Sequence, residues 1–328
     1  VTWSRADELT QSPQGPAMVI ELAAQCDAQG QVQHWQHELW SPGHSRRPGR
    51  SATPALLGAW QVASPHAPPP SIDMPLAVGG GAERNAVPGY QLPAWQVRCH
   101  SVATRRRSSA LRSLGAFGNV FATESFVDEI AHAQGVDALA WRRQHLQHDG
   151  RALAVLDAAA TRAGWPGTGP QAWAQVRGVA DTGLGLATAR YKGSGAWCAV
   201  VAEVQAGERL RVRRLTIAVD VGQAVHPDGV ANQIEGGAIQ ATSWALLEQA
   251  RPAHEGWPDY PILRCSDVPQ VDVIIMPSTA PSLGAGEASL GPTAAAIANA
   301  LFNALGVRVR DLPLSPDHII AAMETPPR

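Results

Sequence analysis

The sequence predicts an α+β fold in which mixed β-sheets pack against helices. A strand hairpin is expected near the start, three consecutive helices follow, and a second group of strands precedes a final apolar helix. Of the 328 residues, 45% are hydrophobic and 16% are charged, so the chain can bury a substantial core as one large or two smaller domains. We divide it into a first part, residues 1–175, and a second part, residues 176–328.

The first part opens with strands. Two β-rich segments within residues 17–40 flank the turn Asp27–Gly30, which predicts a hairpin, and Trp95–Cys99 predicts a further strand. Residues 42–93 are rich in proline and glycine and show no sustained period. They are therefore expected to form a long loop or a covering segment outside the core.

Three helices complete the first part. Residues 119–134 carry apolar side chains at helical spacing, and Asp137 is placed to cap a second helix. A third helix is expected over residues 151–163, where Gly164 ends it. Residues 165–175 are expected to form a linker.

The second part begins with two β-rich runs, residues 198–204 and 210–221, which predict an antiparallel pair. A helix is expected over residues 230–249, although Gly236 and Gly237 lie in its interior. Glycine costs about 1 kcal/mol there relative to alanine, so this pair suggests close contact with a neighbouring backbone or a ligand.

Glu287 is the leading candidate for a reactive side chain. It follows Gly284 and Gly286 in a tight loop, and the missing Cβ atoms leave room for a bulky group beside the carboxylate. A strand over residues 271–277 leads into this loop, and Pro292 begins the helix that follows it. The alternative is an exposed acid that merely precedes a helix, because an isolated Gly-x-Gly-Glu motif is weak.

Composition favours a small-molecule substrate. The net charge of −2 and the pI near 6.6 offer no electrostatic reason to bind nucleic acid, and the cluster Arg105–Arg107 is too short to change this. The four cysteines lie far apart without a C-x-x-C pair, so they indicate neither a zinc site nor an iron–sulfur cluster, and buried thiols are expected: Cys26, Cys99, Cys198 and Cys265. His34, His37 and His44 lack a matching ligand group, so they are expected to be surface or core imidazoles.

The expected location is the cytoplasm, with the periplasm or the face of the inner membrane as alternatives. No run approaches the roughly 18 apolar residues of a membrane span, and the first residues lack a signal-like pattern. Because the chain starts at Val1 without an initiator methionine, a fragment or a processed chain is expected.

Several short motifs follow one another in a characteristic order. They are Val1–Glu8, Leu111–Gly115, Glu124–Glu129, Val219–Gly222, His226–Pro227, Gln233–Gly237, Asp259–Pro261, Gly284–Glu287 and Ala298–Ala300. Each motif alone is weak, but the ordered set covers the whole chain and resembles the molybdenum-binding subunit of the xanthine oxidase family, in the branch of isoquinoline 1-oxidoreductase and related aldehyde dehydrogenases. The resemblance implies a molybdopterin-binding fold of the xanthine oxidase and aldehyde oxidoreductase type.

The resemblance also implies a reaction. Such enzymes hydroxylate an electron-poor carbon of an N-heteroaromatic ring or an aldehyde with oxygen from water, and Glu287 would be the general base. Arg112 would lie on the pocket loop, where a guanidinium can orient the substrate or stabilise negative charge on it. The alternative for Arg112 is a structural ion pair with Glu124 or Asp128.

Cofactor contacts are implied in the same way, and no side chain is expected to ligate the metal. Gln233 would hydrogen-bond the pterin, and Gln240 shares its helix face, although a solvated polar face is equally compatible with that spacing. The backbone N–H groups of Leu114, Gly115 and Ala116 would serve the oxo ligand of the metal. Four further residues are expected at the cofactor: Gly236, Gly284, Ala285 and Gly286.

The implied cofactor is molybdenum-molybdopterin in the cytosine dinucleotide form. The sequence contains no Gly-Gln-Gly pterin-binding stretch, so the N-terminal half of the molybdenum subunit is an expected partner. An iron–sulfur subunit with 2Fe-2S clusters is the second, and a flavin or cytochrome c subunit is an optional third. Two departures from the family pattern are Leu111, where an aromatic residue is common, and His226, where asparagine is usual.

Two other functions stay open at this point. The chain is alternatively a catalytically silent assembly half of a molybdoenzyme subunit, which a cofactor analysis of the complete complex would reveal. A hydrolase that pairs Glu287 with a histidine ranks low, because the sequence has no G-x-S-x-G motif.

Overall fold

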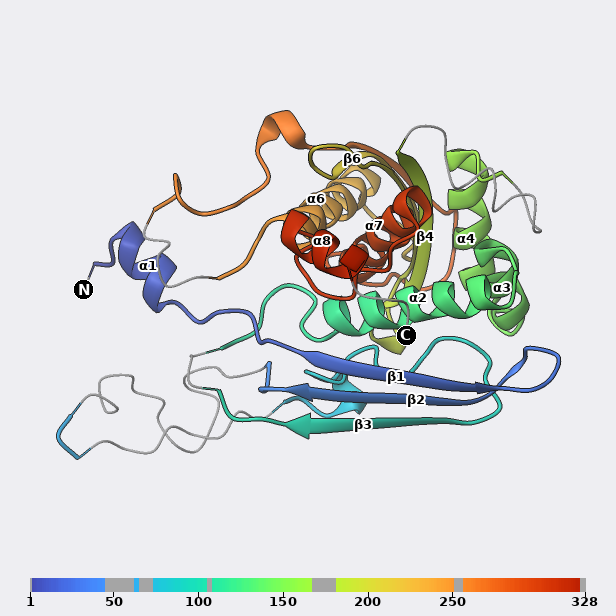
Figure 1. Cartoon of the computed structure of the whole chain (residues 1–328), viewed down its shortest axis with the longest axis horizontal. Coiled ribbons are helices and arrows are strands. Elements are labelled where there is room, and N and C mark those ends of the chain that lie inside the picture. Colours follow the sequence, from blue (N-terminus) through green and yellow to red (C-terminus); the bar gives the residue numbers. More distant parts are fainter. Residues whose placement is uncertain are drawn as a thin grey trace.

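The computed structural model describes residues 2–44, 62–64, 73–104, 108–166, 181–250 and 256–324. These residues form two β-sheets and several layers of helices (Figure 1). The cluster Arg105–Arg107 and most of the predicted linker, residues 167–175, lie outside the described residues, as does the division at 175/176.

The first sheet has three strands, β1 (Val19–Cys26), β2 (Val32–Ser41) and β3 (Trp95–Ser101). β1 and β2 pair antiparallel around the predicted turn, whereas β2 and β3 are parallel. The predicted hairpin and the predicted third strand are therefore confirmed. The sheet lies along helix α2 (Ala116–Ala133) (Figure 1). The ring of Trp35 packs edge-to-face on Phe126, with 5.2 Å between the ring centroids.

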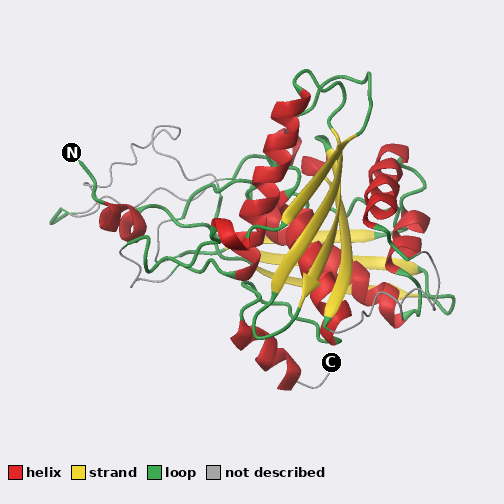
Figure 2. Cartoon of the chain, turned by 90° about the horizontal axis from the view of Figure 1, so that it is seen from above, coloured by secondary structure: helices red, strands yellow, loops and turns green. Residues whose placement is uncertain are grey.

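The second sheet has four strands in the order β4-β5-β6-β7. They are β4 (Thr182–Arg190), β5 (Trp197–Gln205), β6 (Arg211–Asp220) and β7 (Gln270–Ile275). β4, β5 and β6 pair antiparallel, and β7 adds parallel to β6. Helices cover both faces of this sheet (Figure 2). The predicted pair β5–β6 and the strand β7 are confirmed, but β4 was not predicted.

The predicted helices are present, with small shifts at their ends. The middle of the chain forms α2, α3 (Ala138–His145) and α4 (Gly150–Ala163), and the second part forms α6 (Pro227–Leu246) and α7 (Leu290–Leu305). The Asp137 carboxylate caps α3 as predicted, since it accepts from two backbone N–H groups at 3.0 Å. α1 (Arg5–Gln11) and α8 (Pro316–Glu324) were not predicted. The described residues also include three short 3₁₀ turns: Leu76–Val78, Tyr191–Gly193 and Cys265–Asp267.

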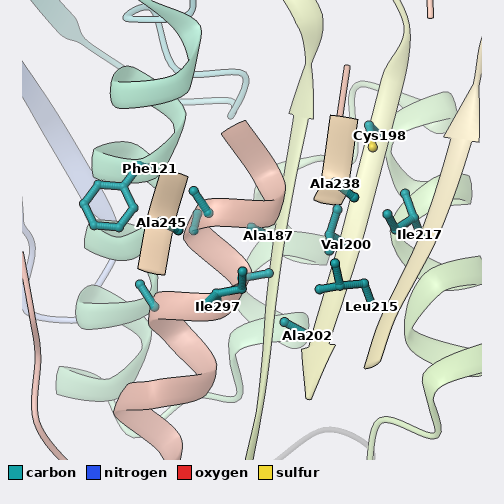
Figure 3. Packing of buried hydrophobic residues seen from close by; sticks show 14 of the residues in the cluster. Phe121, Ala187, Cys198, Val200, Ala202, Leu215, Ile217, Ala238, Ala245 and Ile297 are labelled. Atoms are coloured by element: carbon teal, nitrogen blue, oxygen red, sulfur yellow. The ribbon is translucent and has the colours of Figure 1, made fainter. Parts of the chain in front are cut away.

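Side chains of β5 alternate between two buried clusters, as the two-residue period of a strand requires. Cys198, Val200 and Ala202 face α6 and α7, together with Ile217 of β6 and Ile297 of α7 (Figure 3). The residues that alternate with them along β5 are Trp197, Ala199 and Val201. These residues face the other cluster, to which α4 contributes. Both clusters include residues from either side of position 175. The division of the chain at this position therefore describes the sequence alone and stays a prediction.

Two glycines let α7 lie directly on β4. A Cβ atom on Gly185 would stand 2.1 Å from the backbone nitrogen of Ala300, and one on Gly183 would stand 2.2 Å from the carbonyl oxygen of the same residue. Only glycine fits such distances. Glycine also lowers strand propensity. The two residues that this packing requires are therefore the reason why the sequence does not predict β4.

The expectation of buried thiols is wrong for three of the four cysteines. Only Cys198 is buried, whereas Cys26, Cys99 and Cys265 are exposed. Cys26 and Cys99 belong to β1 and β3, whose residues are half-buried or exposed. Within the described residues, no helix combines the length and the apolar character needed to cross a bilayer.

Candidate active site around Glu287

Glu287 lies in the loop that joins β7 to α7, and backbone hydrogen bonds hold this loop against the end of β6. The amide of Met276 donates to the carbonyl of Val219 at 2.9 Å, and Leu283 donates to Val221 at 2.7 Å. Between them, Gly222 adopts φ +68°, and a Cβ atom there would stand 2.1 Å from the carbonyl oxygen of Pro281. The loop therefore has a fixed path before it reaches Glu287.

The Glu287 carboxylate is held on both of its oxygens. The backbone N–H of Ser113 donates to Oε1 at 2.7 Å, and the hydroxyl of Tyr191 donates to Oε2. The guanidinium of Arg84 lies 3.7 Å from Oε2, and the Glu287 side chain is 28% exposed. A carboxylate with these partners is not a free surface acid. The structure therefore argues against the alternative that Glu287 is an exposed acid that merely precedes a helix.

Ser113 reaches Glu287 through an unusual backbone. Ser113 has φ +80° and Leu114 has φ +50°, a left-handed conformation that costs a non-glycine residue about 1–2 kcal/mol. The Ser113 side chain is buried, and its hydroxyl has no hydrogen-bond partner among the described residues. Strain of this kind is typical of functional loops, and here it accompanies the hydrogen bond to Glu287.

Arg84 belongs to the site but was not predicted from the sequence. Its Nε donates to the carbonyl of Gly79 at 2.5 Å, its Nη2 donates to Gly80 at 3.0 Å, and its Nη1 donates to the Tyr191 hydroxyl. The expectation that residues 42–93 lie outside the core is wrong for this stretch, because Ala82, Arg84 and Ala86 are buried. Gly79 and Gly80 have φ +109° and +64°, so the glycine run was the signal that this loop has a defined shape.

A buried amide holds the Arg84 loop in place. Asn119 of α2 donates to the carbonyls of Ala82 and Arg84 at 2.7 and 2.9 Å, and its own oxygen lies 3.1 Å from Nε2 of His37. Burial lowers the pKa of His37 to about 4, although the bond to Asn119 opposes the shift, so the ring is neutral near pH 7. His37 is therefore a core imidazole, as is the buried His44.

Arg112 connects helix α6 to the Glu287 loop. Its Nε donates to the carbonyl of Gly286 at 2.5 Å, its Nη2 donates to the carbonyl and the side-chain oxygen of Gln233, and its Nη1 donates to Gln240. Burial lowers the pKa of Arg112, and the Glu287 charge opposes that shift. Gln233 and Gln240 therefore both accept hydrogen bonds from Arg112, in addition to lying on the same face of α6.

The alternative ion pair of Arg112 with Glu124 or Asp128 is wrong. Both carboxylates are buried and already paired with Arg142, at 2.9 and 3.4 Å, and Asp128 also pairs with Arg308 at 3.2 Å. Arg142, a fully buried residue of α3, is therefore the partner of these carboxylates in place of Arg112.

The predicted oxo-binding amides are already engaged within the protein. The N–H of Leu114 donates to Leu111 at 3.0 Å, Gly115 to Gly81 at 3.1 Å and Ala116 to Ser113 at 3.1 Å. The bonds of Leu114 and Ala116 close the turn that begins α2, and the bond of Gly115 ties this turn to the loop at Gly81. None of the three N–H groups is therefore free for a ligand in this arrangement.

Other predicted cofactor residues line an accessible face. A Cβ atom on Gly236 or Gly284 would meet nothing within 4 Å, and one on Gly286 would meet only the Gln233 side chain at 3.5 Å. Gln233, Ala285 and Gly286 also border an open hollow of about 350 Å³. By contrast, a Cβ atom on Gly237 would stand 2.4 Å from Oγ of Ser289. The close contact at this pair is therefore at the second glycine and with a side chain, whereas a neighbouring backbone or a ligand was expected.

His226, one of the two departures from the expected pattern, also borders this hollow. It is the N-cap of α6, and its Nδ1 accepts from the N–H of Gly229 at 2.7 Å. Asparagine is a common N-cap that accepts the same kind of bond, so the ring of His226 can replace it there.

Comparison with known proteins identifies the group to which this site belongs. A family model described as a molybdopterin cofactor-binding domain matches residues 122–269. A nicotinate dehydrogenase subunit of Pseudomonas putida is 35% identical over 98% of the chain, and the isoquinoline 1-oxidoreductase beta subunit of Brevundimonas diminuta is 31% identical over 96%. The chain belongs to the molybdenum-binding subunits of the xanthine oxidase family. It spans only 27% and 38% of the length of these two relatives.

Solved structures confirm the fold expected for this xanthine oxidase family member. Quinoline 2-oxidoreductase from Pseudomonas putida 86 matches 99% of the chain and aldehyde oxidoreductase from Desulfovibrio gigas matches 98%, with TM-scores of 0.75 and 0.76. The match covers 64% and 51% of those two chains, and the sequence identity is 14% in both cases. The predicted α+β class is confirmed with it.

The described residues can accommodate the molybdopterin cofactor of the xanthine oxidase family along this accessible face. Gly236, Gly284 and Gly286 leave unfilled space where other residues would place a Cβ atom, and the exposed amide of Gln233 stands beside them. No group of three or more His, Cys, Asp or Glu side chains in the described ranges is arranged to hold a metal ion. The face therefore offers amide groups and open space to a planar ligand.

Proposed function

We propose that the chain is the part of a molybdenum hydroxylase that carries the general base, Glu287. The observation that supports this most directly is the fixed carboxylate: Ser113 and Tyr191 hold its two oxygens beside an accessible face bordered by Gln233 and Gly286. A general base must be held within hydrogen-bond reach of the proton that it removes, and this arrangement fixes one in that way.

The chemistry divides between the cofactor and the protein. When bound, the molybdenum cofactor supplies the water-derived oxygen and takes up the electrons of the substrate. Glu287 would accept, on its carboxylate, the proton that this reaction releases. A carboxylate has about four acceptor positions, and the bonds from Ser113 and Tyr191 leave some of them open for this proton.

Arg112 acts on this site through other residues. Its contacts with Gly286, Gln233 and Gln240 use most of its N–H groups and tie the cofactor-facing helix to the loop of the base. We therefore propose a positioning role for Arg112 in place of the direct substrate contact that the resemblance suggested.

The proposed substrate is an N-heteroaromatic compound or an aldehyde. The names of the relatives and of the solved structures include nicotinate, isoquinoline, quinoline and aldehyde enzymes. We further propose the cytosine dinucleotide form of the cofactor, 2Fe-2S clusters in a separate subunit, and the remaining part of the molybdenum subunit as partners. A flavin or cytochrome c subunit would be the final acceptor in this arrangement.

Replacing the base in the complete native complex tests the proposal. Glu287→Gln keeps the side-chain shape but cannot accept the proton, so turnover should fall by roughly 10²–10⁴-fold with a heterocycle or aldehyde panel and an artificial acceptor. Molybdenum content should stay at the wild-type level. Glu208→Gln, in an exposed turn between β5 and β6, is the matched control.

Two results would contradict the proposal. Near-normal turnover of a molybdenum-replete Glu287→Gln complex would remove Glu287 as the base. A wild-type complex that lacks molybdopterin would instead support the silent assembly role.

A further inference from the structure

Tyr191 stands between an arginine and the proposed base. Its hydroxyl accepts from Nη1 of Arg84 and donates to Oε2 of Glu287. A phenol has one hydrogen, so with Arg84 as donor on one side this hydrogen is directed to the carboxylate. Burial and the neighbouring Glu287 raise the pKa of Tyr191, so the hydroxyl keeps its proton and remains a donor.

One asparagine, Asn85, hydrogen-bonds to the backbone on both sides of Tyr191. Nδ2 of Asn85 donates to the carbonyl of Arg190 at 2.8 Å, and its Oδ1 accepts from the N–H of Lys192 at 2.9 Å. Asn85 thus binds the residues before and after Tyr191. Asn85 and Lys192 both have left-handed φ angles, +62° and +59°, which shows that the two loops meet in a specific, costly geometry.

Arg84 cannot readily take over the role of the tyrosine. Its side chain is 7% exposed, and the carbonyls of Gly79 and Gly80 hold its Nε and Nη2. Its nearest nitrogen lies 3.7 Å from Oε2, which is beyond hydrogen-bond distance. The tyrosine hydroxyl is therefore the group that bridges the two charges.

We propose that Tyr191 is the positioning residue of the base: its hydroxyl fixes the orientation of the Glu287 carboxylate. This inference rests on the proposed role of Glu287. It extends the site beyond Glu287 and Arg112 to a loop pair, residues 84–85 and 190–192.

The expected effect follows from the groups that face Glu287. These are the guanidinium groups of Arg84 and Arg112, the Ser113 amide and the Tyr191 hydroxyl. Removing the hydroxyl takes away the hydrogen bond to Oε2 and leaves the bond from Ser113 to Oε1 and both arginines in place. The carboxylate should then turn away from its fixed orientation, and the base should be misplaced for the reaction.

The test is Tyr191→Phe in the complete native complex, with Tyr260→Phe as the matched control. Tyr260 donates to the carboxylate of Glu248 at 3.0 Å, so its variant removes the same kind of bond elsewhere. For Tyr191→Phe, kcat should fall by about tenfold while KM stays at the wild-type value, because the base is misplaced but substrate binding is retained. Molybdenum content should not change, and the control should keep the wild-type kcat and KM.

A second readout does not depend on activity. If the hydroxyl and the carboxylate act together, the thermal stabilities of Tyr191→Phe, Glu287→Gln and the double variant should be non-additive. Asn85→Ala, which removes both hydrogen bonds to the backbone beside Tyr191, should lower kcat as Tyr191→Phe does.

An unchanged kcat, additive stabilities, or a parallel loss of molybdenum and activity in Tyr191→Phe would each overturn the inference. The two hypotheses can fail separately. Full turnover of Glu287→Gln contradicts the proposed function, whereas an inactive Glu287→Gln with a fully active Tyr191→Phe contradicts only the role of Tyr191.

Discussion

Two adjacent glycines of α6 should respond in opposite ways to the same substitution. A Cβ atom on Gly237 would stand 2.4 Å from Oγ of Ser289 and 3.1 Å from Cδ1 of Leu290. Ser289 is buried, and its hydroxyl donates to the carbonyl of Ile234 at 2.9 Å, so it cannot turn away without losing that bond. A Cβ atom on Gly236 would meet nothing within 4 Å.

The magnitudes follow from these contacts. Gly236→Ala should stabilise the protein by about 1 kcal/mol, the difference in helix propensity between the two residues. Gly237→Ala gains the same amount, but overpacking costs about 1–3 kcal/mol and the lost hydrogen bond about 1 kcal/mol, which leaves a net destabilisation of about 2 kcal/mol. The two variants should therefore differ by about 3 kcal/mol.

Thermal unfolding monitored by calorimetry measures this difference, since each kcal/mol moves the Tm of a chain of this size by about 2 °C. Gly236→Ala should melt above the wild type and Gly237→Ala below it. Equal shifts of the two variants would refute the close approach of α6 to Ser289. Because Gly236 borders the proposed cofactor face, Gly236→Ala should also lose molybdenum while it gains stability.

Two further predictions concern buried charge. Arg142→Met leaves Glu124 without its charged partner, so the free energy of unfolding should fall by about 3–5 kcal/mol, measured by urea denaturation; a loss below 1 kcal/mol would contradict this. His37 has a pKa of about 4 when folded and about 6.5 when unfolded, so stability should be lost as the pH falls between these values, by about 3 kcal/mol in total. In His37→Gln that part of the pH dependence should disappear.

The sequence predicted elements whose signals are local. Asp137 and Gly164 mark the ends of helices because caps depend on neighbouring residues, and both lie where they were predicted. β4 was missed because Gly183 and Gly185 serve the packing of α7, more than one hundred residues away in the chain. Such a requirement cannot be read from a strand taken alone.

The same reasoning explains which site residues were found. Glu287 stands in a glycine-rich motif next to a helix start, so its setting is visible in a few residues. Arg84 and Tyr191 acquire their roles only through each other and Glu287, across 107 and 96 positions of sequence. Neither has a local motif, and the proline-rich surroundings of Arg84 favoured a covering loop.

The hydrogen bonds around Glu287 have a consequence for how the protein folds. Its partners Ser113 and Tyr191 are 174 and 96 residues away, and Arg112 reaches Gly286 across another 174. Contacts of high sequence separation form slowly, because the chain must close long loops before they contribute any stability. The helices α2 to α4 can form from local contacts, whereas the geometry of the base depends on the complete tertiary structure. We therefore expect Glu287 to be oriented in the final stages of folding, when the chain has already buried most of its core.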